Sequence, residues 1–354
     1  MKRVLLLKFT SLGDLIHALP ALTDASRAIP EIKFDWMIDE NFAEVATWHK
    51  SVDQIYLTSH RTWRKEKLSS IKPITRLIRK ARETKYDLVL DGQGNFKTAL
   101  MSLFMQGPRA GFDRRSAREW VASFAYQRKY PASRKAHAID RLRQLFAQSL
   151  GYPCPTTPPD FSIERSRFAP LPFQTPQNYV VLIHNAAWKN KIWPEEHAKK
   201  LVDWIAKKGY TIYLPWGNPE EKARALRLSV NPLAVVLPKM SLSKIGSLFI
   251  GASACISMDT GLSHLAAALN IPTITLYGPT DSGLIGANGK NQIHLVSNLP
   301  CAPCNKKQCR YENQGELNPP CLAGLSPEKV FDLLMGILEP ASDCGKRALN
   351  ICNK

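Results

Sequence analysis

The polar run from Met258 to His264 has the residue types and spacing to bind a phosphate group. Residues 252–257 before it predict a short buried strand, and residues 265–269 after it predict the apolar start of a helix. Unpaired N–H groups and the helix dipole attract anions at such a junction. Gly261 would let the backbone approach a diphosphate closely. Hydroxyl donors are supplied by Thr260 and Ser263.

Two other interpretations fit this segment when it is taken alone. The triplet that starts at Asp259 also occurs in aspartic proteases, but these need two carboxylates that share a proton, and this chain has the triplet once. An ordinary strand–turn–helix would use Ser263 as the helix cap and leave His264 solvated in the first turn. In the phosphate interpretation, His264 donates to a phosphate oxygen in either tautomer. The segment alone leaves the cap and the phosphate site equally open.

The N-terminus predicts a second strand-to-helix junction. The apolar run Val4–Leu7 is followed by a polar loop and then by a helical pattern over residues 15–22. The loop lacks the spacing of a Walker A motif and of Gly-x-Gly-x-x-Gly. It carries Asp14 next to Gly13, at the strand end where open α/β sheets bind their ligands. Asp14 is therefore either a site carboxylate or a helix N-cap.

Strand-like and helix-like segments alternate along the whole chain, which predicts parallel α/β sheets. The predicted strands are Val4–Leu7, Phe34–Ile38, Leu88–Leu90, Val180–Ile183, Ile212–Leu214, Val235–Leu237, Cys255–Ser257 and Thr273–Leu276. A proline-rich stretch, residues 153–176, predicts a linker between two domains. With 354 residues, each domain is large enough to bury a core. We expect domains at residues 1–165 and 170–325, followed by a C-terminal helix and tail at 326–354.

Positive charge is concentrated in the first half of the chain. The net charge is +18, and residues 1–150 hold 27 Lys and Arg against 15 Asp and Glu. Between Ser59 and Lys85, ten basic residues face two acids. A second basic group consists of Arg114, Arg115, Arg118, Arg128, Lys129, Arg134 and Lys135. Such surfaces attract nucleic acid, anionic lipid or a phosphorylated glycolipid. No zinc-finger, RNP or basic-zipper pattern favours nucleic acid.

Four of the eight cysteines have spacing typical of a metal knuckle: Cys301, Cys304, Cys309 and Cys321. The alternative is a cysteine-rich loop without metal, kept reduced in the cytosol. The sequence leaves both open, with structural metal the weaker candidate.

The sequence contains no recognisable targeting signal. The N-terminal apolar run is too short for a signal peptide, and no window approaches the roughly 20 apolar residues of a membrane span. We expect a cytoplasmic protein whose basic surface touches the inner face of the membrane. Trp63, among basic residues, either enters that interface or packs half-buried.

Several blocks of the sequence resemble bacterial lipopolysaccharide heptosyltransferases, the glycosyltransferase family 9 enzymes. The blocks run in family order and are Lys8–Asp14, His17–Leu22, Trp193–His197, Leu214–Gly217, Leu237–Leu242, Asp259–His264 and Tyr277–Asp281. Three more resemble the heptosyltransferase I branch rather than the heptosyltransferase II branch: Phe34–Trp36, Trp63–Lys65 and Gly283–Gly286.

The resemblance implies a glycosyltransferase-B architecture, in which two Rossmann-like domains face each other across a cleft. It implies an inverting transfer of L-glycero-D-manno-heptose from ADP-heptose to Kdo of the Kdo-lipid A inner core, without a cofactor. Asp14 would be the general base. The acceptor would contact Thr10, Ser11, Gly13, Arg61, Arg64 and Lys65. The donor would contact Lys191, Glu221, Met240, Asp259, Thr260, Gly261 and His264. No metal is required, because Lys191, His264 and a helix N-terminus can offset the charge of the leaving diphosphate.

One departure from the family concerns the donor loop. Close relatives have a threonine pair where this chain has Ala186 and Ala187, so two hydroxyl donors are missing. The alternatives to heptosyltransferase I are heptosyltransferase II, another glycosyltransferase that uses a sugar nucleotide, and, from a different class, a nucleic-acid-binding α/β protein. A nicotinamide-dependent dehydrogenase would need the Gly-x-Gly-x-x-Gly fingerprint, which is missing.

Overall fold

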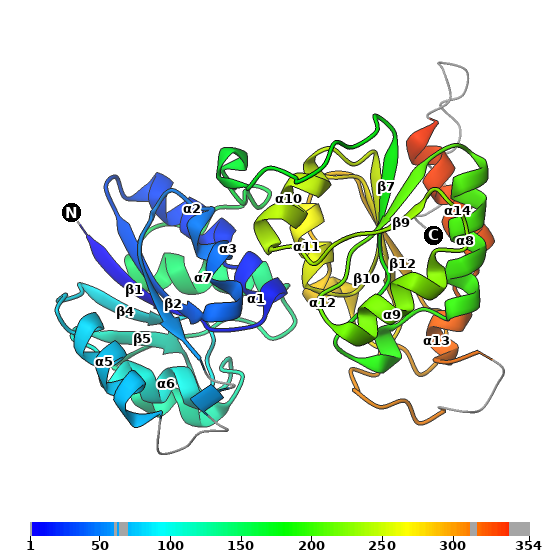
Figure 1. Cartoon of the computed structure of the whole chain (residues 1–354). Coiled ribbons are helices and arrows are strands. Elements are labelled where there is room, and N and C mark those ends of the chain that lie inside the picture. The colour runs from blue at the N-terminus through cyan, green and yellow to red at the C-terminus, as the bar shows by residue number, and fades with distance from the viewer. Residues whose placement is uncertain (1, 60–61, 64–69, 312–316, 340–354) are drawn as a thin grey trace. The chain divides into compact units, whose positions relative to one another are not determined.

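Two six-stranded sheets, both entirely parallel, organise the computed structural model (Figure 1). The structure describes residues 2–59, 62–63, 70–311 and 317–339. The chain divides into two compact units. The first unit consists of Met1–Pro170, Ser241–Ser247 and Gly283–Gly289, and the second of Leu171–Met240, Leu248–Ser282 and Lys290–Lys354. The change from one to the other at Pro170 lies within the proline-rich stretch.

The first sheet has the strand order β3-β2-β1-β4-β5-β6. Its strands are β1 (Arg3–Leu7), β2 (Lys33–Asp39), β3 (Val52–Thr58), β4 (Leu88–Asp91), β5 (Arg109–Phe112) and β6 (Arg128–Tyr130). The second sheet has the order β12-β11-β10-β7-β8-β9. Its strands are β7 (Tyr179–Ile183), β8 (Thr211–Leu214), β9 (Ala234–Val236), β10 (Ala254–Met258), β11 (Thr273–Tyr277) and β12 (Gln292–Val296). Both orders are those of doubly wound Rossmann-like folds.

Helices link the strands of each sheet, as parallel pairing requires. Those around the first sheet are α1 (Leu12–Ile16), α2 (Leu19–Ala28), η1 (Glu40–Phe42), α3 (Ala43–Thr47), α5 (Ile71–Ala81), α6 (Phe96–Leu103), η2 (Trp120–Ala125) and α7 (Ala138–Leu150). The remaining helices are η3 (Arg165–Arg167), η4 (Lys189–Lys191), α8 (Glu195–Lys207), α9 (Pro219–Leu228), α10 (Leu242–Ile250), α11 (Gly261–Ala268), α12 (Ser282–Ile285), α13 (Pro320–Ala323) and α14 (Pro327–Leu338).

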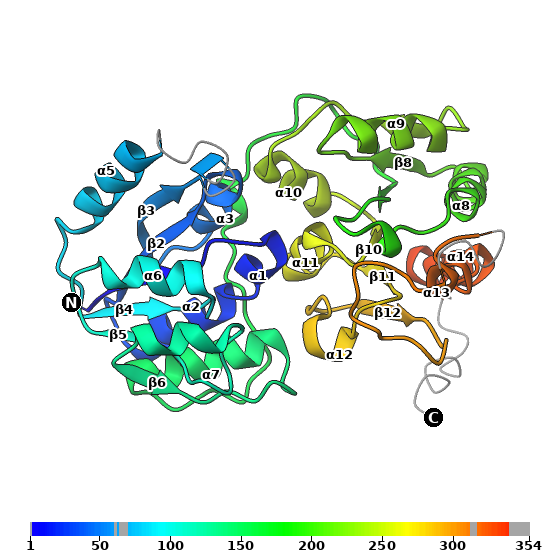
Figure 2. The same ribbon diagram turned by 90° about the horizontal axis from the view of Figure 1, so that it is seen from below.

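Alternating side chains of the central strands fill a separate core on each face of the first sheet. Leu5 and Leu7 of β1 point to the face that α5 and α6 cover, where Ala81 and Met101 pack against them. On the other face α2 packs against α7. Figure 1 shows α5 and α6 on one side of the first sheet and α2 and α7 on the other, and Figure 2 views this sheet from the side of α5 and α6.

In the second unit, one core cluster joins the sheet to α8, α9 and α14. Leu201 of α8, Leu228 of α9 and Leu334 of α14 are fully buried in it. The described part of the C-terminal helix therefore packs as part of the second unit's core.

The predicted α/β class and parallel sheets are confirmed, and every predicted strand is present to within about two residues. Strands β3, β5, β6 and β12 were not predicted from the sequence. Two of these, β5 and β6, are only 4 and 3 residues long. The edge strands β3 and β12 have few fully buried residues, so their apolar signal is weak.

Candidate active site

Most of the predicted donor-binding residues follow the ends of parallel strands in the second sheet. Lys191 lies beyond β7, Glu221 beyond β8, Met240 beyond β9 and Asp259 immediately after β10. Because the strands are parallel, their carboxyl ends share one edge of the sheet. Ligands of open α/β folds bind at this edge.

Asp259 is the centre of a buried polar cluster at that edge. Its side chain is 4% exposed. Oδ2 accepts from Lys191 Nζ at 2.6 Å and from Thr280 Oγ1 at 2.5 Å. Nε2 of His264 lies 3.9 Å from Oδ1. Thr280 is buried and was not among the predicted site residues, although it follows β11, which pairs with β10.

The helix after Asp259 begins as predicted, but its cap differs from the prediction. Thr260 is the N-cap of α11, with Gly261 as the first helical residue. Ser263 was predicted to offer its hydroxyl to a phosphate. This is wrong, because the hydroxyl is buried and donates to the Thr260 carbonyl at 2.6 Å. The alternative with Ser263 as the N-cap is also wrong.

Positive charge collects beside Asp259 on the loop after β7. Lys191 Nζ lies 4.5 Å from the centre of the Trp188 ring, and Lys307 Nζ lies 5.8 Å from it. Asn190 Nδ2 donates to the Lys306 carbonyl at 2.7 Å, which ties the two lysine-bearing loops together. In the loop after β7 the Asn185 side chain bonds to the ring of His184 at 2.7 Å.

Glu221 and Met240 lie on the neighbouring loops. Glu221 Oε2 accepts from the Gly217 N–H at 2.7 Å, whereas the neighbouring Glu220 is exposed, which favours Glu221 as the donor-contacting acid of this loop. Trp216 Nε1 donates to the Leu237 carbonyl at 2.5 Å and thereby joins the two loops. Met240 is half-buried beside them in the chain.

The four cysteines that were weak candidates for a metal knuckle are not grouped as metal ligands in the part of the chain that the structure describes. Within the ranges that the structure describes, no three His, Cys, Asp or Glu side chains are grouped to hold a metal ion. Cys301 is exposed, whereas Cys321 is buried in the second unit's core. Burial and the neighbouring thiols raise the pKa of Cys321 to about 11. A Cβ on Gly278 would lie 2.7 Å from Cys321 Sγ, so Cys321 is used in close packing.

The second group of candidate residues lies in the first unit, where β1 leads into α1. Asp14 is the third residue of α1 and half-buried. Its Oδ2 accepts from the backbone N–H of Ser11 at 3.0 Å and from the Ser11 hydroxyl at 2.9 Å. Asp14 is therefore the inner partner of a capping box rather than the N-cap. Among the described residues, both hydrogen bonds use Oδ2, so Oδ1 remains for a ligand.

Charges around Asp14 keep its carboxyl ionised. Burial by itself would raise the pKa of Asp14, but Lys8, the two bonds from Ser11 and Arg118 outweigh it and lower the pKa below its usual range. Lys8 Nζ donates to the Gly92 carbonyl at 3.0 Å. Its own pKa is lowered, mainly by burial. At neutral pH Asp14 is therefore a carboxylate, as a general base must be.

Lys8→Met tests this electrostatic arrangement. Without the Lys8 charge the pKa of Asp14 rises, so Asp14 becomes protonated at higher pH. We expect the acidic limb of the pH profile of kcat/KM to move to higher pH. Lys33→Met, at the start of β2, is the control and should leave the limb where it is. An unmoved limb in a folded Lys8→Met protein would contradict the assignment.

A cavity of about 340 Å³ opens beside Asp14. Lys8, Asp14, His17, Gln93, Arg118, Arg134 and Arg141 line it, with Asp14 as the only acid among all its lining residues. Arg141 Nη2 donates to the Ser116 carbonyl at 2.5 Å, and the Arg141 guanidinium lies 5.2 Å from the centre of the Phe112 ring. The cavity suits an anionic acceptor. Arg118 and Arg134 belong to the second basic group noted in the sequence, but Arg141 was not predicted.

Gln93 holds the backbone of the loop that leads to Asp14. Its Oε1 accepts from Phe9 N at 2.8 Å and Thr10 N at 3.3 Å, and its Nε2 donates to the Thr10 carbonyl at 2.6 Å. Asp91 Oδ1 in turn accepts from the Gln93 N–H at 2.8 Å. The pairing of β1 with β4 puts Leu7 opposite Asp91, so the Asp-Gly-Gln sequence after β4 was the signal that could have found Gln93.

Gln93→Ala is expected to lower kcat about 10- to 100-fold, because small displacements of a catalytic group are costly. Donor affinity should stay unchanged, since Gln93 contacts the acceptor-side loop only. Gln127→Ala is a matched control, because Gln127 accepts from the Arg109 N–H at 2.6 Å elsewhere in the same sheet. Steady-state kinetics with separate donor binding by calorimetry would distinguish the two. Equal losses in both variants would point to a general structural effect.

The remaining acceptor-side predictions have different outcomes. Thr10, Ser11 and Gly13 lie on the loop and first turn beside Asp14. Arg61, Arg64 and Lys65 lie outside the described residues. Trp63 is half-buried and packs against the core under α5, which favours the packing interpretation of this residue.

The model of the protein family glycosyltransferase family 9 (heptosyltransferase) matches residues 74–314 of this chain. The chain belongs to glycosyltransferase family 9. The family predicted from the sequence blocks is thereby confirmed. A member of this family is a glycosyltransferase, so the enzyme class is confirmed as well.

Relatives of this family 9 glycosyltransferase are similar over nearly the whole chain. Lipopolysaccharide heptosyltransferase 1 of Pseudomonas aeruginosa is 43% identical over 95% of this chain and 98% of its own length. The protein of the same name from Escherichia coli K12 is 46% identical over 82% of this chain and 92% of its own length. Part of a heptosyltransferase 2 from Haemophilus influenzae matches only 25% of this chain, with 37% identity.

Solved structures agree with the fold of this glycosyltransferase. The E. coli heptosyltransferase WaaC with ADP has a TM-score of 0.83 and 40% identity, covering 95% of this chain and 99% of that one. E. coli heptosyltransferase II has a TM-score of 0.75 at 19% identity, covering 96% and 98%, and shows the fold alone. In the described part of the chain, no helix combines the length and apolarity needed to cross a membrane.

Proposed function

We propose that the enzyme transfers L-glycero-D-manno-heptose from ADP-heptose to Kdo of the Kdo-lipid A inner core, with inversion at the anomeric carbon. The observation that carries the proposal is the buried cluster at the carboxyl edge of the second sheet. There Lys191, Asp259, Thr280 and His264 adjoin the N-terminus of α11. This combination of cation, hydroxyl and helix dipole fits a sugar linked to a diphosphate.

In the donor complex, Lys191 and the N-terminal N–H groups of α11 neutralise the diphosphate. Asp259 lies between Lys191 and His264, and a carboxylate next to a phosphate would repel it. We therefore assign Asp259 to the heptose hydroxyls and to the positioning of Lys191, rather than to the phosphates. Glu221 fits the two ribose hydroxyls, and Met240 offers a flexible thioether surface to adenine.

The reaction is a single displacement. Asp14 removes the proton of a Kdo hydroxyl while that oxygen forms a bond to the anomeric carbon of the heptose. The bond between the anomeric carbon and the phosphate oxygen breaks, and ADP leaves with the electron pair. Lys191, His264 and the helix N-terminus stabilise the charge that develops on it. In the acceptor complex, the cavity arginines Arg118, Arg134 and Arg141 bind the Kdo carboxylates.

The first heptose transfer is favoured over the second by similarity. The relatives at 43% to 46% identity carry the name heptosyltransferase 1, whereas heptosyltransferase II matches at 19%. We propose that the enzyme works at the cytoplasmic face of the inner membrane, where a lipid-linked acceptor would be presented.

The deciding experiment measures ADP release from ADP-heptose, with and without Kdo-bearing lipid A, in the presence of a metal chelator. We expect release that depends on this acceptor and is insensitive to the chelator. Release only with an acceptor that already carries one heptose would instead identify a second heptosyltransferase. Loss of release on chelation would contradict the metal-independent mechanism. Tight, salt-sensitive binding to DNA without donor turnover would favour the nucleic-acid alternative.

A further inference from the structure

The outer surface of α6 is apolar where a helix facing solvent would be polar. Phe96, Leu100, Leu103 and the C-cap residue Phe104 are between 43% and 55% exposed. Their spacing puts them on one face of the helix. The opposite face, with Ala99 and Met101, is buried. The core is covered by that buried face, so about half of each of these apolar side chains faces solvent.

The apolar surface continues onto η2, which packs on α6 through Ala99, Ala122 and Tyr126. Glu119, just before η2, accepts from the Phe96 N–H at 2.9 Å and fastens the two elements together. Large exposed side chains of η2 are Trp120, Val121 and Phe124, the last 68% exposed. The rings of Trp120 and Phe124 contact each other with centroids 5.7 Å apart.

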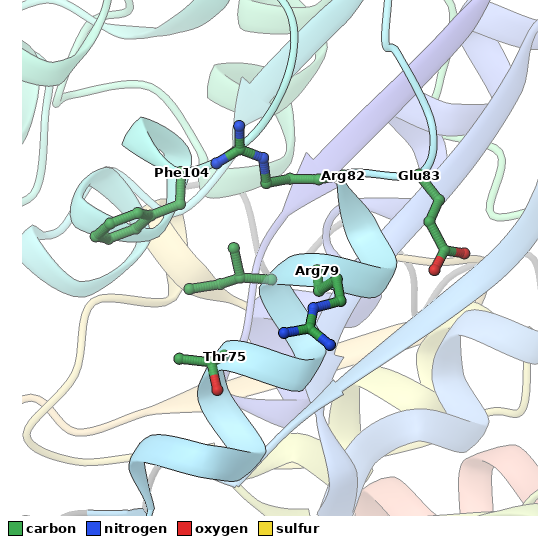
Figure 3. A pocket seen from close by; sticks show the side chains of 6 residues that line it. Thr75, Arg79, Arg82, Glu83 and Phe104 are labelled. Atoms are coloured by element: carbon green, nitrogen blue, oxygen red, sulfur yellow. The ribbon is translucent and has the colours of Figure 1, made fainter.

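On the other side, α6 borders α5 across a hollow of about 540 Å³ with mainly apolar walls (Figure 3). Phe104 reaches it from the end of α6, while Thr75, Arg79 and Arg82 project from α5 and the turn after it. The surface formed by α5, α6 and η2 is called the apolar face below. Exposed apolar side chains gathered on neighbouring elements indicate an interaction site.

Basic side chains outnumber the acids, Glu83 and Glu119, around the apolar face. Within α5 the charged residues are Lys72, Arg76, Arg79 and Lys80, all exposed and without an acid among them. Lys97 is exposed on α6, and the Arg114 guanidinium lies 5.0 Å from the centre of the Trp120 ring. Apolar and aromatic residues rimmed by Lys and Arg are the combination that binds an anionic bilayer. A second copy of this chain would bring like charges together.

The apolar face begins where the cavity beside Asp14 ends. Gln93 and Arg118 line that cavity, and they come shortly before Phe96 and Trp120 in the sequence. The Glu119 N–H donates to the Gly94 carbonyl at 3.0 Å, so the two chain segments leave the cavity side by side. A glycolipid could thus keep its acyl chains in a bilayer under the apolar face while its sugar enters the cavity.

We propose that the apolar face docks on an anionic phospholipid bilayer. Phe96, Leu100, Phe104, Trp120 and Phe124 enter the headgroup and acyl boundary, and the lysines and arginines of α5 contact phosphates. The inference deepens the proposed function, because it rests on a lipid-linked acceptor for its purpose. The surface itself is identified from exposure and charge alone.

The test is co-sedimentation of the full chain with vesicles that contain no sugar acceptor, so its outcome does not depend on the transfer reaction. Vesicles of phosphatidylethanolamine and phosphatidylglycerol in equal amounts are compared with vesicles of phosphatidylcholine. We expect binding to the anionic vesicles that weakens as salt is added. The double variant Leu100→Ser/Phe124→Ser should reduce partitioning about tenfold, since two apolar side chains no longer leave water.

The matched control is Leu226→Ser/Val230→Ser, which removes two equally exposed apolar residues in and after α9 of the second unit. It should bind vesicles like the unmodified protein. A second variant, Arg76→Gln/Lys80→Gln, changes exposed charges only and should remove the preference for anionic vesicles. Unchanged partitioning of the Leu100→Ser/Phe124→Ser protein would overturn the proposal. The proposal would also be overturned if the unmodified protein formed a dimer without vesicles and the Leu100→Ser/Phe124→Ser protein were monomeric. A second copy of the chain would then be the partner of the apolar face.

Discussion

Asp14→Asn is expected to lower kcat by roughly 100- to 10,000-fold, the range of a lost general base. Asparagine has nearly the same shape and can still accept the hydrogen bonds that Ser11 donates to Asp14. It cannot take up the proton of the attacking hydroxyl. The fold and the affinity for ADP-heptose should therefore persist while transfer is lost.

Asp140→Asn is the matched control for this substitution. Asp140 is likewise the third residue of its helix, α7, and is exposed outside the cavity. Single-turnover kinetics and calorimetric donor binding are measured for both variants. If Asp14→Asn lost donor affinity and thermal stability together with turnover, Asp14 would have a structural role. Near-normal turnover would remove it from the mechanism.

Lys191→Ala is expected to weaken ADP-heptose binding about 10- to 100-fold, the equivalent of a charged hydrogen bond, and to slow transfer as well. Lys191 Nζ is paired with the buried Asp259 carboxylate at 2.6 Å. Without the lysine, the Asp259 carboxylate loses its cationic partner and repels an incoming diphosphate. Both effects act in the same direction.

The control is Lys189→Ala, which removes an exposed lysine from the same turn. The double variant Lys191→Ala/Asp259→Asn separates the two effects, since it removes the repelling charge together with its partner. Donor affinity should recover in part relative to Lys191→Ala. Identical affinities for Lys191→Ala and the unmodified enzyme would exclude Lys191 from the donor site.

Local sequence signals were reliable where one segment contains the whole signal. The apolar strands before Asp14 and Asp259 are recognisable because each is buried on both faces and short. The following helices begin with polar caps, so the positions of both carboxylates at strand ends could be predicted. The edge strands β3 and β12 were missed because half of their residues face away from the core.

Contacts between segments far apart in the chain could not be predicted from the sequence. Gln93 was missed because its role depends on strands β1 and β4 being neighbours in register. Thr280 was missed for the same reason, since it meets Asp259 only because β11 pairs with β10. Cysteine spacing left a metal knuckle open as the weaker candidate, but Cys321 packs in the second unit's core beside Gly278.

The sequence by itself determined the α/β class, the alternation of strands with helices, the family and the strand ends that carry Asp14 and Asp259. These follow from local periodicity and from motifs a few residues long. Only the tertiary structure decided which side chains meet there, and which apolar face of α6 is left exposed. The physical reason is that α6 carries apolar residues on both its buried and its exposed face, so its packing neighbours select which one is buried.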